Sequence, residues 1–462
     1  MMGTRVLFLT AWLLLSMATL PVRGQEGTGQ RPVRSPRLTE VLAELHAGNS
    51  GAVQEFWQRM ERDGTPLIER IPGDPWHYLT TFLWHAKEPI TNVLLISGLS
   101  NNTYARGYVG QNLLSPLPGT DIWYRTYRVR SDARFTYELS VNDSLVPSED
   151  EEHPDQRESR FRSDPLNPRH AAGPDSESLA ELPDAPVQSW LSPESDSPKG
   201  EVHEFKFKGK ILNSERKIWV YTPSGYDRST TPNRLAIFLD GDFYTSGIPV
   251  PVILDNLLAA KKIVPAIAVF MGNLADGQPA ARTTELSCFP PFTEFLAKEL
   301  VPWIHERYRV TSRPAETLIA GVSRGGTGAV CAALEHPEIF GNVSSQSGFF
   351  VYKDRNWFKN AARKEAPDAE SQEEMAWEQY GVLMQQFASK PRLEIRFYLD
   401  IGRFENDFHP SPLIASRHLR DVLLAKGYQV KYQEFSGHHS LVNWRGTLPD
   451  ALIYFFDVTA AH

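Results

Sequence analysis

The second half of the chain alternates short apolar segments with amphipathic segments, and this alternation restricts the fold more than any other feature. From Glu201 onward, the apolar segments have the length and β-branched content of strands. The clearest amphipathic segment, FTEFLAKELVPWIHERY (292–308), carries apolar residues at helical spacing along one face. Strands that alternate with helices predict a mostly parallel sheet covered by helices on both faces.

The order of these segments specifies the architecture further. The expected strands are EFKFK, KIWVYTP, RLAIFLD, PAIAVF, TLIAG, NVSSQS, LEIRFYLDIG and YQVKYQEF. The first two follow each other without a helix, which predicts an antiparallel start to the sheet. This order is the plan of an α/β-hydrolase, expected over residues 201–462.

The first half of the chain predicts a different kind of domain. Residues 25–49 are expected to form a leader and a short helix, LTEVLAELHAGN, with Thr39 as its N-cap. The strands YLTTFLW, NVLLI, DIWYRTYRV and ARFTYEL then follow without helices. They predict a small, all-β, immunoglobulin-like sandwich over residues 50–142. Residues 143–200 are rich in Pro, Ser and Asp, and we expect a linker there.

Charge and the N-terminal segment restrict partners and location. A formal net charge of -8 argues against a nucleic-acid surface, which requires clustered cations. Residues 1–24 combine Arg5, an apolar run and small residues before Gln25, which is typical of a cleaved secretory signal peptide. We therefore expect export, to the periplasm or the medium, without stable membrane insertion after cleavage.

The cysteines and histidines give no indication of a metal centre. Cys288 and Cys331 are the two cysteines of the chain, and they either pair or stay free and buried. The adjacent histidines His438 and His439 do not by themselves make a zinc site, which needs three or four converging ligands. We expect neither a metal nor a cofactor.

The stretch TLIAGVSRGG (317–326) predicts a serine nucleophile. Ser323 lies between a buried strand and a helix, with Gly321 and Gly325 two residues to either side. Small residues at these positions permit the strained turn that exposes a nucleophile. The backbone N–H of Arg324 is one expected oxyanion donor. The N–H of Asp242, after the strand RLAIFLD, is the second, although Asp-Gly also makes ordinary turns.

A serine nucleophile needs a base and an acid, which follow it in this fold in the order acid, then histidine. The loop after LEIRFYLDIG carries Glu405 and Asp407, and the last strand is followed by His438 and His439. Both groups fall at the strand ends where the topology requires them. The residues alone leave the choice within each pair open.

Several ordered stretches resemble the enterochelin (enterobactin) esterase family, siderophore-cleaving members of the esterase D-like α/β-hydrolases. The resemblance spans about Phe56 to Phe456. In the second half it is carried by FLDGDFY, RTTELSCFPPF, GVSRGG, HPEIFGNVSSQSG, IGRFE and GHHSLVNWRGTL, and in the first half by DGTPLIE, TTFLW, GTDIWYRTYRV and SDPLNPR.

The resemblance implies roles for particular residues. His439, five residues before Trp444, becomes the base, and Glu405 becomes the acid in preference to Asp407 and Asp400. The substrate cleft is implied to include Arg282, Glu285, Tyr244 and Trp444, of which the arginine would attract an anionic catecholate complex. Some positions depart from the family pattern: Arg324 replaces an aromatic or small residue, His438 a glycine and Ser440 an aspartate, and the aromatic run after SQSG, FFVY (349–352), has no Trp.

The activity that the resemblance implies is hydrolysis of a small-molecule ester by a Ser-His-Glu triad. The implied substrate is the serine-lactone ester of a catecholate siderophore such as ferric enterobactin. One alternative is a feruloyl or acetyl esterase acting on plant polysaccharide, because fold alone does not determine substrate. Others are a non-catalytic binding protein and an acyltransferase that uses the same residues.

Overall fold

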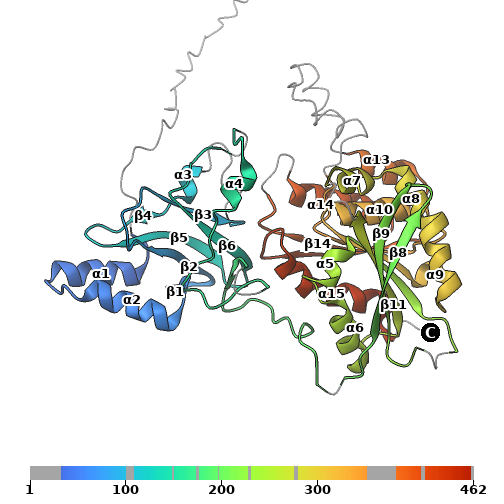
Figure 1. The fold of residues 1–462 in the computed structure, drawn as a ribbon, viewed down its shortest axis with the longest axis horizontal. Helices are drawn as coiled ribbons and strands as arrows, with labels where there is room; N and C mark the ends of the chain where they lie inside the picture. Colours follow the sequence, from blue (N-terminus) through green and yellow to red (C-terminus); the bar gives the residue numbers. More distant parts are fainter. Residues whose placement is uncertain are drawn as a thin grey trace, which may run out of the picture.

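The computed structural model describes residues 33–99, 109–147, 150–172, 176–195, 197–226, 230–274, 279–350, 381–406 and 411–458. These residues form two domains that lie side by side (Figure 1). The expected signal peptide, residues 1–24, and the candidate acid Asp407 lie outside the described residues. Within the described part of the chain, no helix combines the length and apolar character that a bilayer crossing demands.

The C-terminal domain is built on an eight-stranded sheet in the order β15-β14-β13-β12-β10-β11-β9-β8. Pairs β8–β9 and β9–β11 are antiparallel and the other pairs are parallel, so the predicted α/β-hydrolase is confirmed. Its strands are β8 (Glu201–Gly209), β9 (Ser214–Thr222), β10 (Arg234–Leu239), β11 (Ala266–Leu274), β12 (Thr317–Val322), β13 (Asn342–Gln346), β14 (Arg396–Gly402) and β15 (Gln429–Phe435).

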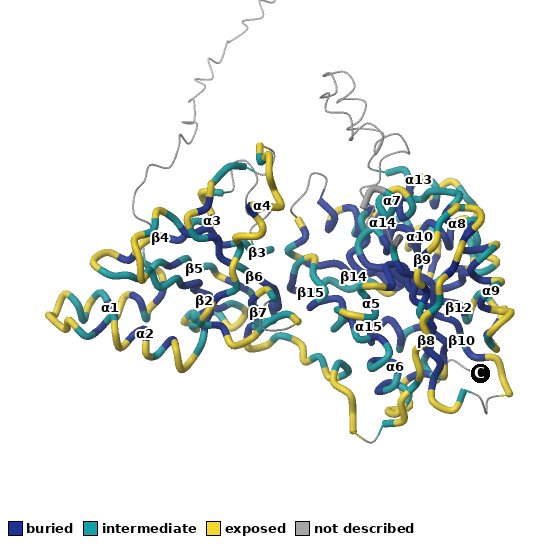
Figure 2. The backbone as a smooth tube through the Cα atoms, in the orientation of Figure 1, coloured by how far each residue is buried: buried dark blue, intermediate teal, exposed yellow. Residues whose placement is uncertain are grey.

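Helices bury both faces of this sheet. One face packs against α8 (Pro290–Phe295), η2 (Leu296–Leu300), α9 (Val301–Arg307), α10 (Arg324–Glu335), α13 (Val382–Ser389) and α14 (Pro412–Ala425). The other packs against α5 (Gly241–Thr245), α6 (Val250–Ala259) and α15 (Leu441–Phe456). In β12, Ile319 joins the first core while Leu318 and Ala320 join the second. The central strands are accordingly buried along their length (Figure 2).

The N-terminal domain is a sandwich of two antiparallel sheets. One sheet has the order β1-β2-β5-β4 and the other β3-β6-β7, and Phe82, Phe135 and Tyr137 pack between them. The strands are β1 (Leu67–Ile71), β2 (Asp74–His85), β3 (Val93–Ser97), β4 (Ser115–Pro116), β5 (Ile122–Arg130), β6 (Arg134–Val141) and β7 (Ser178–Glu181). Two short helices, α3 (Val109–Asn112) and α4 (Pro154–Glu158), flank it.

Two helices cover the outer face of the larger sheet. They are α1 (Pro36–His46) and α2 (Ala52–Asp63), and their apolar side chains pack with Leu83 and Tyr124. The expected N-cap of α1 was wrong. Its cap is Ser35, whose side chain accepts the N–H of Leu38, because the helix begins at Pro36. Residues 52–63, expected within the sandwich, form α2 instead.

The linker expected over residues 143–200 requires a correction. Strand β7 lies inside this range and pairs with β6, so this part of the chain completes the N-terminal domain. Buried polar pairs there add to the apolar contacts of Ala180 and Leu182 with the sandwich core: Arg157 contacts Asp143 at 2.6 Å in a buried ion pair, and the Tyr137 hydroxyl donates to Asp164 at 2.8 Å. Composition alone therefore misled, because a polar segment can be buried when its groups bond one another.

The two cysteines, for which the sequence left both states open, form a disulfide. Cys288 follows α7 (Pro279–Glu285), and Cys331 lies in α10. The bond therefore connects the segment beside the cavity described below to the helix that directly follows Ser323.

Candidate active site

Ser323 occupies the turn between β12 and α10. Its backbone has φ 55° and ψ -124°, a conformation that residues other than glycine rarely adopt. Its N–H donates to the carbonyl of Gln346 at 2.8 Å, which fixes the turn to β13. A Cβ on Gly321 would lie 2.2 Å from the carbonyl carbon of Gly325, so this position tolerates only glycine. The expected nucleophile turn is thus present.

The loop expected to supply the second oxyanion donor lies beside this turn. Asp240, at the end of β10, has φ 60°, and α5 starts at the next residue, so Asp242 lies in its first turn. A Cβ on Gly325 would lie 2.5 Å from the Asp240 carboxylate, which shows how closely the loop approaches α10. The amides of Asp242 and Arg324 both belong to first helical turns, whose N–H groups point away from the helix body. Both amides therefore remain the predicted donors.

Glu405 and His439 are brought together from the ends of β14 and β15. The Nδ1 atom of His439 lies 2.7 Å from Oε2 of Glu405. The carboxylate is buried, whereas the imidazole is 43% exposed and so accessible to a substrate. This arrangement orients the ring and leaves Nε2 available for proton transfer.

The second carboxylate oxygen of Glu405 is also held. It accepts the Gly402 N–H at 2.8 Å and the Ser347 hydroxyl at 2.5 Å. Ser347 in turn accepts the indole N–H of Trp444 at 2.8 Å. The ring of Trp444 also packs edge-on against His439, with centroids 4.7 Å apart. Trp444 thus supports both members of the acid–histidine pair.

Two residues of this network were missed by the sequence analysis. Ser347 binds Glu405, and buried Gln346 connects β13 to α15 by donating to the Trp444 carbonyl at 2.8 Å. Both follow from NVSSQS, where polar residues interrupt an otherwise buried strand. That interruption was the available signal, since buried polar groups need partners.

Asp400, the remaining alternative acid, has another environment. It is buried within β14, and burial raises its pKa to about 7. Its backbone carbonyl accepts the Ser347 N–H at 2.9 Å. The carboxylate that bonds His439 is that of Glu405.

Ser323 and His439 line the same cavity, which has a volume of about 420 Å³. Trp444 and Arg282 line it too, as predicted for the substrate cleft. Residues 171–172 and 176–177, from the segment that completes the N-terminal domain, line it as well. The cavity is therefore formed by both domains.

Two arginines place positive charge beside the nucleophile turn. The guanidinium of Arg282 bonds both carboxylate oxygens of buried Asp240 at 2.6 Å. The guanidinium of Arg324 lies over the Phe349 ring at 5.1 Å, and burial, followed by the charge of Arg282, lowers its pKa. Much of the charge of Arg282 is balanced by Asp240.

The structure does not bring the other two predicted cleft residues to the cavity. Tyr244 is fully buried, and its hydroxyl donates to the Gln346 side chain at 3.2 Å. Glu285 forms an ion pair with buried Arg216 at 3.0 Å. Neither is among the residues that line the cavity with Ser323. Their contacts are those of packing residues that hold β13 and β9.

Ser440, where the family has an aspartate, caps α15. Its side chain accepts the Val442 N–H at 3.4 Å, and its backbone is extended as a cap requires. A serine and an aspartate cap a helix by the same means, so this substitution preserves the local structure. Among the described residues, no cluster of three or more His, Cys, Asp or Glu side chains has the arrangement of a metal site.

Comparison with protein families identifies both domains. The putative esterase family matches residues 209–455, and the N-terminal domain of enterochelin esterase matches residues 79–191. The chain belongs to the putative esterase family. It combines that catalytic domain with the enterochelin esterase N-terminal domain, which confirms the resemblance found in the sequence, and it is a serine ester hydrolase.

Individual relatives extend over nearly the whole chain. An iron(III) enterobactin esterase of Dickeya dadantii is 27% identical over 88% of this chain and 94% of its own length. An iron(III) salmochelin esterase of Escherichia coli is 26% identical over 90% and 96%. Among solved structures, the ferric enterobactin esterase of Salmonella typhimurium has a TM-score of 0.67 at 23% identity, covering 87% of this chain and 98% of that one.

Proposed function

We propose that this esterase hydrolyses the serine-lactone esters of a catecholate siderophore and thereby releases its iron. The observation that carries the proposal is the combination of both matched domains around one cavity that contains Ser323 and His439. The relatives that share this combination carry the names of enterobactin and salmochelin esterases.

The geometry supports a Ser-His-Glu mechanism. The Ser323 hydroxyl attacks the ester carbonyl while His439 accepts its proton, and Glu405 stabilises the imidazolium that forms. The amides of Arg324 and Asp242 bind the oxyanion of the tetrahedral intermediate. His439 then protonates the leaving oxygen of the substrate's serine as the ester bond breaks. Water attacks the acyl-enzyme in a second cycle, with His439 again as base, and regenerates Ser323.

Charge at the cavity supports an anionic substrate. Arg282 lines the cavity and Arg324 directly follows the nucleophile, so a catecholate complex that carries negative charge would be attracted to the reacting end. Arg445, which also lines the cavity, adds a third cation on the side of α15. A neutral polysaccharide ester gains nothing from these charges.

The test is product analysis with purified enzyme. Enterobactin, in iron-free and ferric forms, and feruloylated xylan are incubated separately, and the products are separated by liquid chromatography. The proposal expects linear dihydroxybenzoyl-serine oligomers and turnover of enterobactin well above that of the xylan. Faster release of ferulate would assign the enzyme to polysaccharide esters instead.

Ser323→Ala provides the control for mechanism. We expect it to abolish turnover and labelling by a fluorophosphonate probe, because the acyl-enzyme forms on this oxygen. Its thermal unfolding should match that of the native protein. Full activity of Ser323→Ala would refute the assigned nucleophile, and a native protein that neither reacts with the probe nor turns over any ester would favour the binding-protein alternative.

We also propose that the protein is exported. The composition of residues 1–24 supports cleavage after about Gly24, and the disulfide between Cys288 and Cys331 suits an oxidising compartment. The test is N-terminal sequencing of the protein recovered from the periplasm or medium of its source cells. A mature N-terminus near Gln25 supports export, and full-length protein confined to the cytoplasm contradicts it.

A further inference from the structure

The residues directly before the acid and the base both contact the N-terminal domain. Phe404, which precedes Glu405, packs on the core of the sandwich, with its ring centroid 6.4 Å from that of Phe135. His438, which precedes His439, has Nε2 3.2 Å from the Thr136 hydroxyl. Phe135 and Thr136 are neighbours in β6. One strand of another domain thus contacts both catalytic loops.

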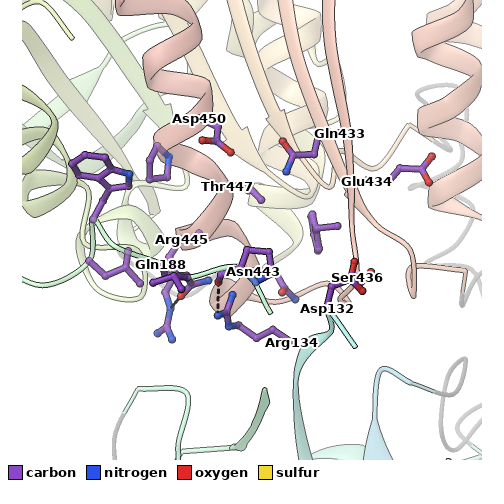
Figure 3. A pocket seen from close by; sticks show the side chains of 17 residues that line it. Asp132, Arg134, Gln188, Gln433, Glu434, Ser436, Asn443, Arg445, Thr447 and Asp450 are labelled. Atoms are coloured by element: carbon purple, nitrogen blue, oxygen red, sulfur yellow. Dashed lines mark hydrogen bonds between the residues drawn. The ribbon is translucent and has the colours of Figure 1, made fainter. Parts of the chain in front are cut away.

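Further hydrogen bonds strengthen this contact between the domains. The N–H of Arg134, also in β6, donates to the Ser436 carbonyl at 3.0 Å, and the Arg130 side chain donates to the Ser436 hydroxyl at 2.9 Å. Figure 3 shows Arg134 lying across from Ser436 and Asn443 at this interface. Because side chains alternate along a strand, Arg134 and Thr136 lie on the same face of β6.

His438 fits closely into this interface. A Cβ on Gly98, the residue after β3, would lie 2.4 Å from the His438 Cβ, so the backbone approaches the histidine as closely as only glycine permits. Its carbonyl accepts the Asn443 side-chain N–H at 2.9 Å. Burial raises the pKa of Glu177, and the neighbouring Thr136 hydroxyl opposes that rise.

The two catalytic loops are bonded to each other as well. The N–H of Phe404 donates to the Gly437 carbonyl at 3.0 Å, and that of Arg403 donates to the Phe435 carbonyl at 2.8 Å. Together with the bond between Glu405 and His439, these contacts make the loops one unit. A shift of His438 away from Thr136 therefore moves the imidazole of His439 relative to Ser323, which is held separately by β13.

We infer that strand β6 of the N-terminal domain positions the acid–histidine pair for proton transfer, through Thr136 against His438 and the sandwich core against Phe404. Thr136 and His438 are positioning residues in this view, since they act through His439. The inference rests on the proposed roles of Ser323, His439 and Glu405. It gives the N-terminal domain a part in the chemical step, separate from its contribution to the cavity wall.

The test compares Thr136→Val with Thr136→Ser in the full-length protein, using p-nitrophenyl acetate as a substrate too small to depend on the cavity wall. Valine keeps the shape and removes the hydroxyl, and we expect kcat to fall about fivefold with KM unchanged, as for one lost hydrogen bond. Serine restores the hydroxyl and should restore kcat. The rate of fluorophosphonate labelling at Ser323 should fall and recover in parallel.

Thr126→Val is the matched control. Thr126 bonds Thr81 at 2.9 Å between β2 and β5, inside the N-terminal domain. The same substitution there should leave kcat unchanged, which separates positioning from a general loss of domain stability. Equal losses in both valine variants, an unchanged kcat in Thr136→Val, or a change confined to KM would overturn the inference.

A second variant acts on the other loop. Phe404→Ala removes the ring that packs on the sandwich core, and we expect a larger fall in kcat than for Thr136→Val, with partial recovery in Phe404→Leu. No loss in Phe404→Ala would also overturn the inference. Failure of the proposed function gives a different result: Ser323→Ala would keep its activity, or enterobactin would remain intact while p-nitrophenyl acetate is still cleaved in a Thr136-dependent way.

Discussion

The nucleophile turn and the acid–histidine loops are held by different means. Ser323 is fixed inside one domain, by the Gln346 carbonyl and by the close approach of Gly321 to α10. Glu405 and His439 lie on loops whose neighbouring residues pack on a second domain. A strained turn needs rigid, local support, whereas two loops at a sheet edge can take theirs from any surface that covers them. Changes at the two places should therefore have different consequences.

The largest effect is expected from breaking the acid–histidine pair itself. Glu405→Gln keeps the size of the side chain but removes the charge that stabilises the imidazolium, and kcat should fall on the order of 10³- to 10⁴-fold. Steady-state hydrolysis of p-nitrophenyl esters measures this. Glu335→Gln, at an exposed pair with Lys390, is the control and should leave kcat unchanged. A loss below tenfold would show that Glu405 is not the acid.

Next in size is a change at the nucleophile turn. Gly321→Ala places a methyl group 2.2 Å from backbone that cannot move away, and it should cost about 3 kcal/mol of unfolding free energy as well as activity. Urea unfolding and ester hydrolysis measure the two losses. Gly110→Ala, where a Cβ meets nothing within 4 Å, should change neither. Normal stability of Gly321→Ala would mean that the turn is less rigid than described.

Acid should weaken the contact between the domains before it affects the turn. Burial lowers the pKa of His438 to about 4, against the opposing charge of Glu405 and with a smaller contribution from His439. The unfolded chain binds this proton below pH 6.5 and the folded chain only near pH 4, so stability falls as the pH drops through this range. Allowing for partial exposure, the loss is about 2 kcal/mol.

The measurement is urea unfolding of the native protein and His438→Gln between pH 7.5 and pH 4. The difference between the two should grow in favour of the variant as the pH falls, because glutamine binds no proton. Glu177 also faces this site, with a pKa raised mainly by burial, and its contribution is common to both proteins. A difference that stays constant with pH would contradict the assigned environment of His438.

The smallest effects are expected at the residues that hold Glu405 from within the catalytic domain. Ser347→Ala and Trp444→Phe each remove one hydrogen bond of the chain that ends on the carboxylate, and each should lower kcat about tenfold or less. Because both act through the same contact, the double variant should lose less than the product of the two. Ser389→Ala, at an exposed helix end, serves as control. If the losses in kcat of the two single variants multiply in full in the double variant, Ser347 and Trp444 act independently of each other.

The sequence by itself determined the sheet and the turn that carries Ser323. Strand periodicity and the glycines around Ser323 are local properties, and they can be recognised in a short stretch of sequence without knowing how the rest of the chain folds. The choice of His439 over His438 required the family resemblance, since two adjacent histidines at one strand end are equivalent in the pattern. The support of Glu405 by Ser347 was missed, because the two residues are 58 positions apart.

Tertiary structure alone decided what lies around these residues. The family resemblance placed Tyr244 and Glu285 in the substrate cleft. In the structure, Tyr244 is buried and its hydroxyl bonds Gln346 of β13, and Glu285 forms an ion pair with Arg216. The polar segment from residue 143 to strand β7 became part of the N-terminal domain, where charged groups such as Asp143 and Arg157 pair with each other. The contact of β6 with the catalytic loops depends on how two domains pack, and packing joins residues about 300 positions apart through surfaces that no local pattern encodes.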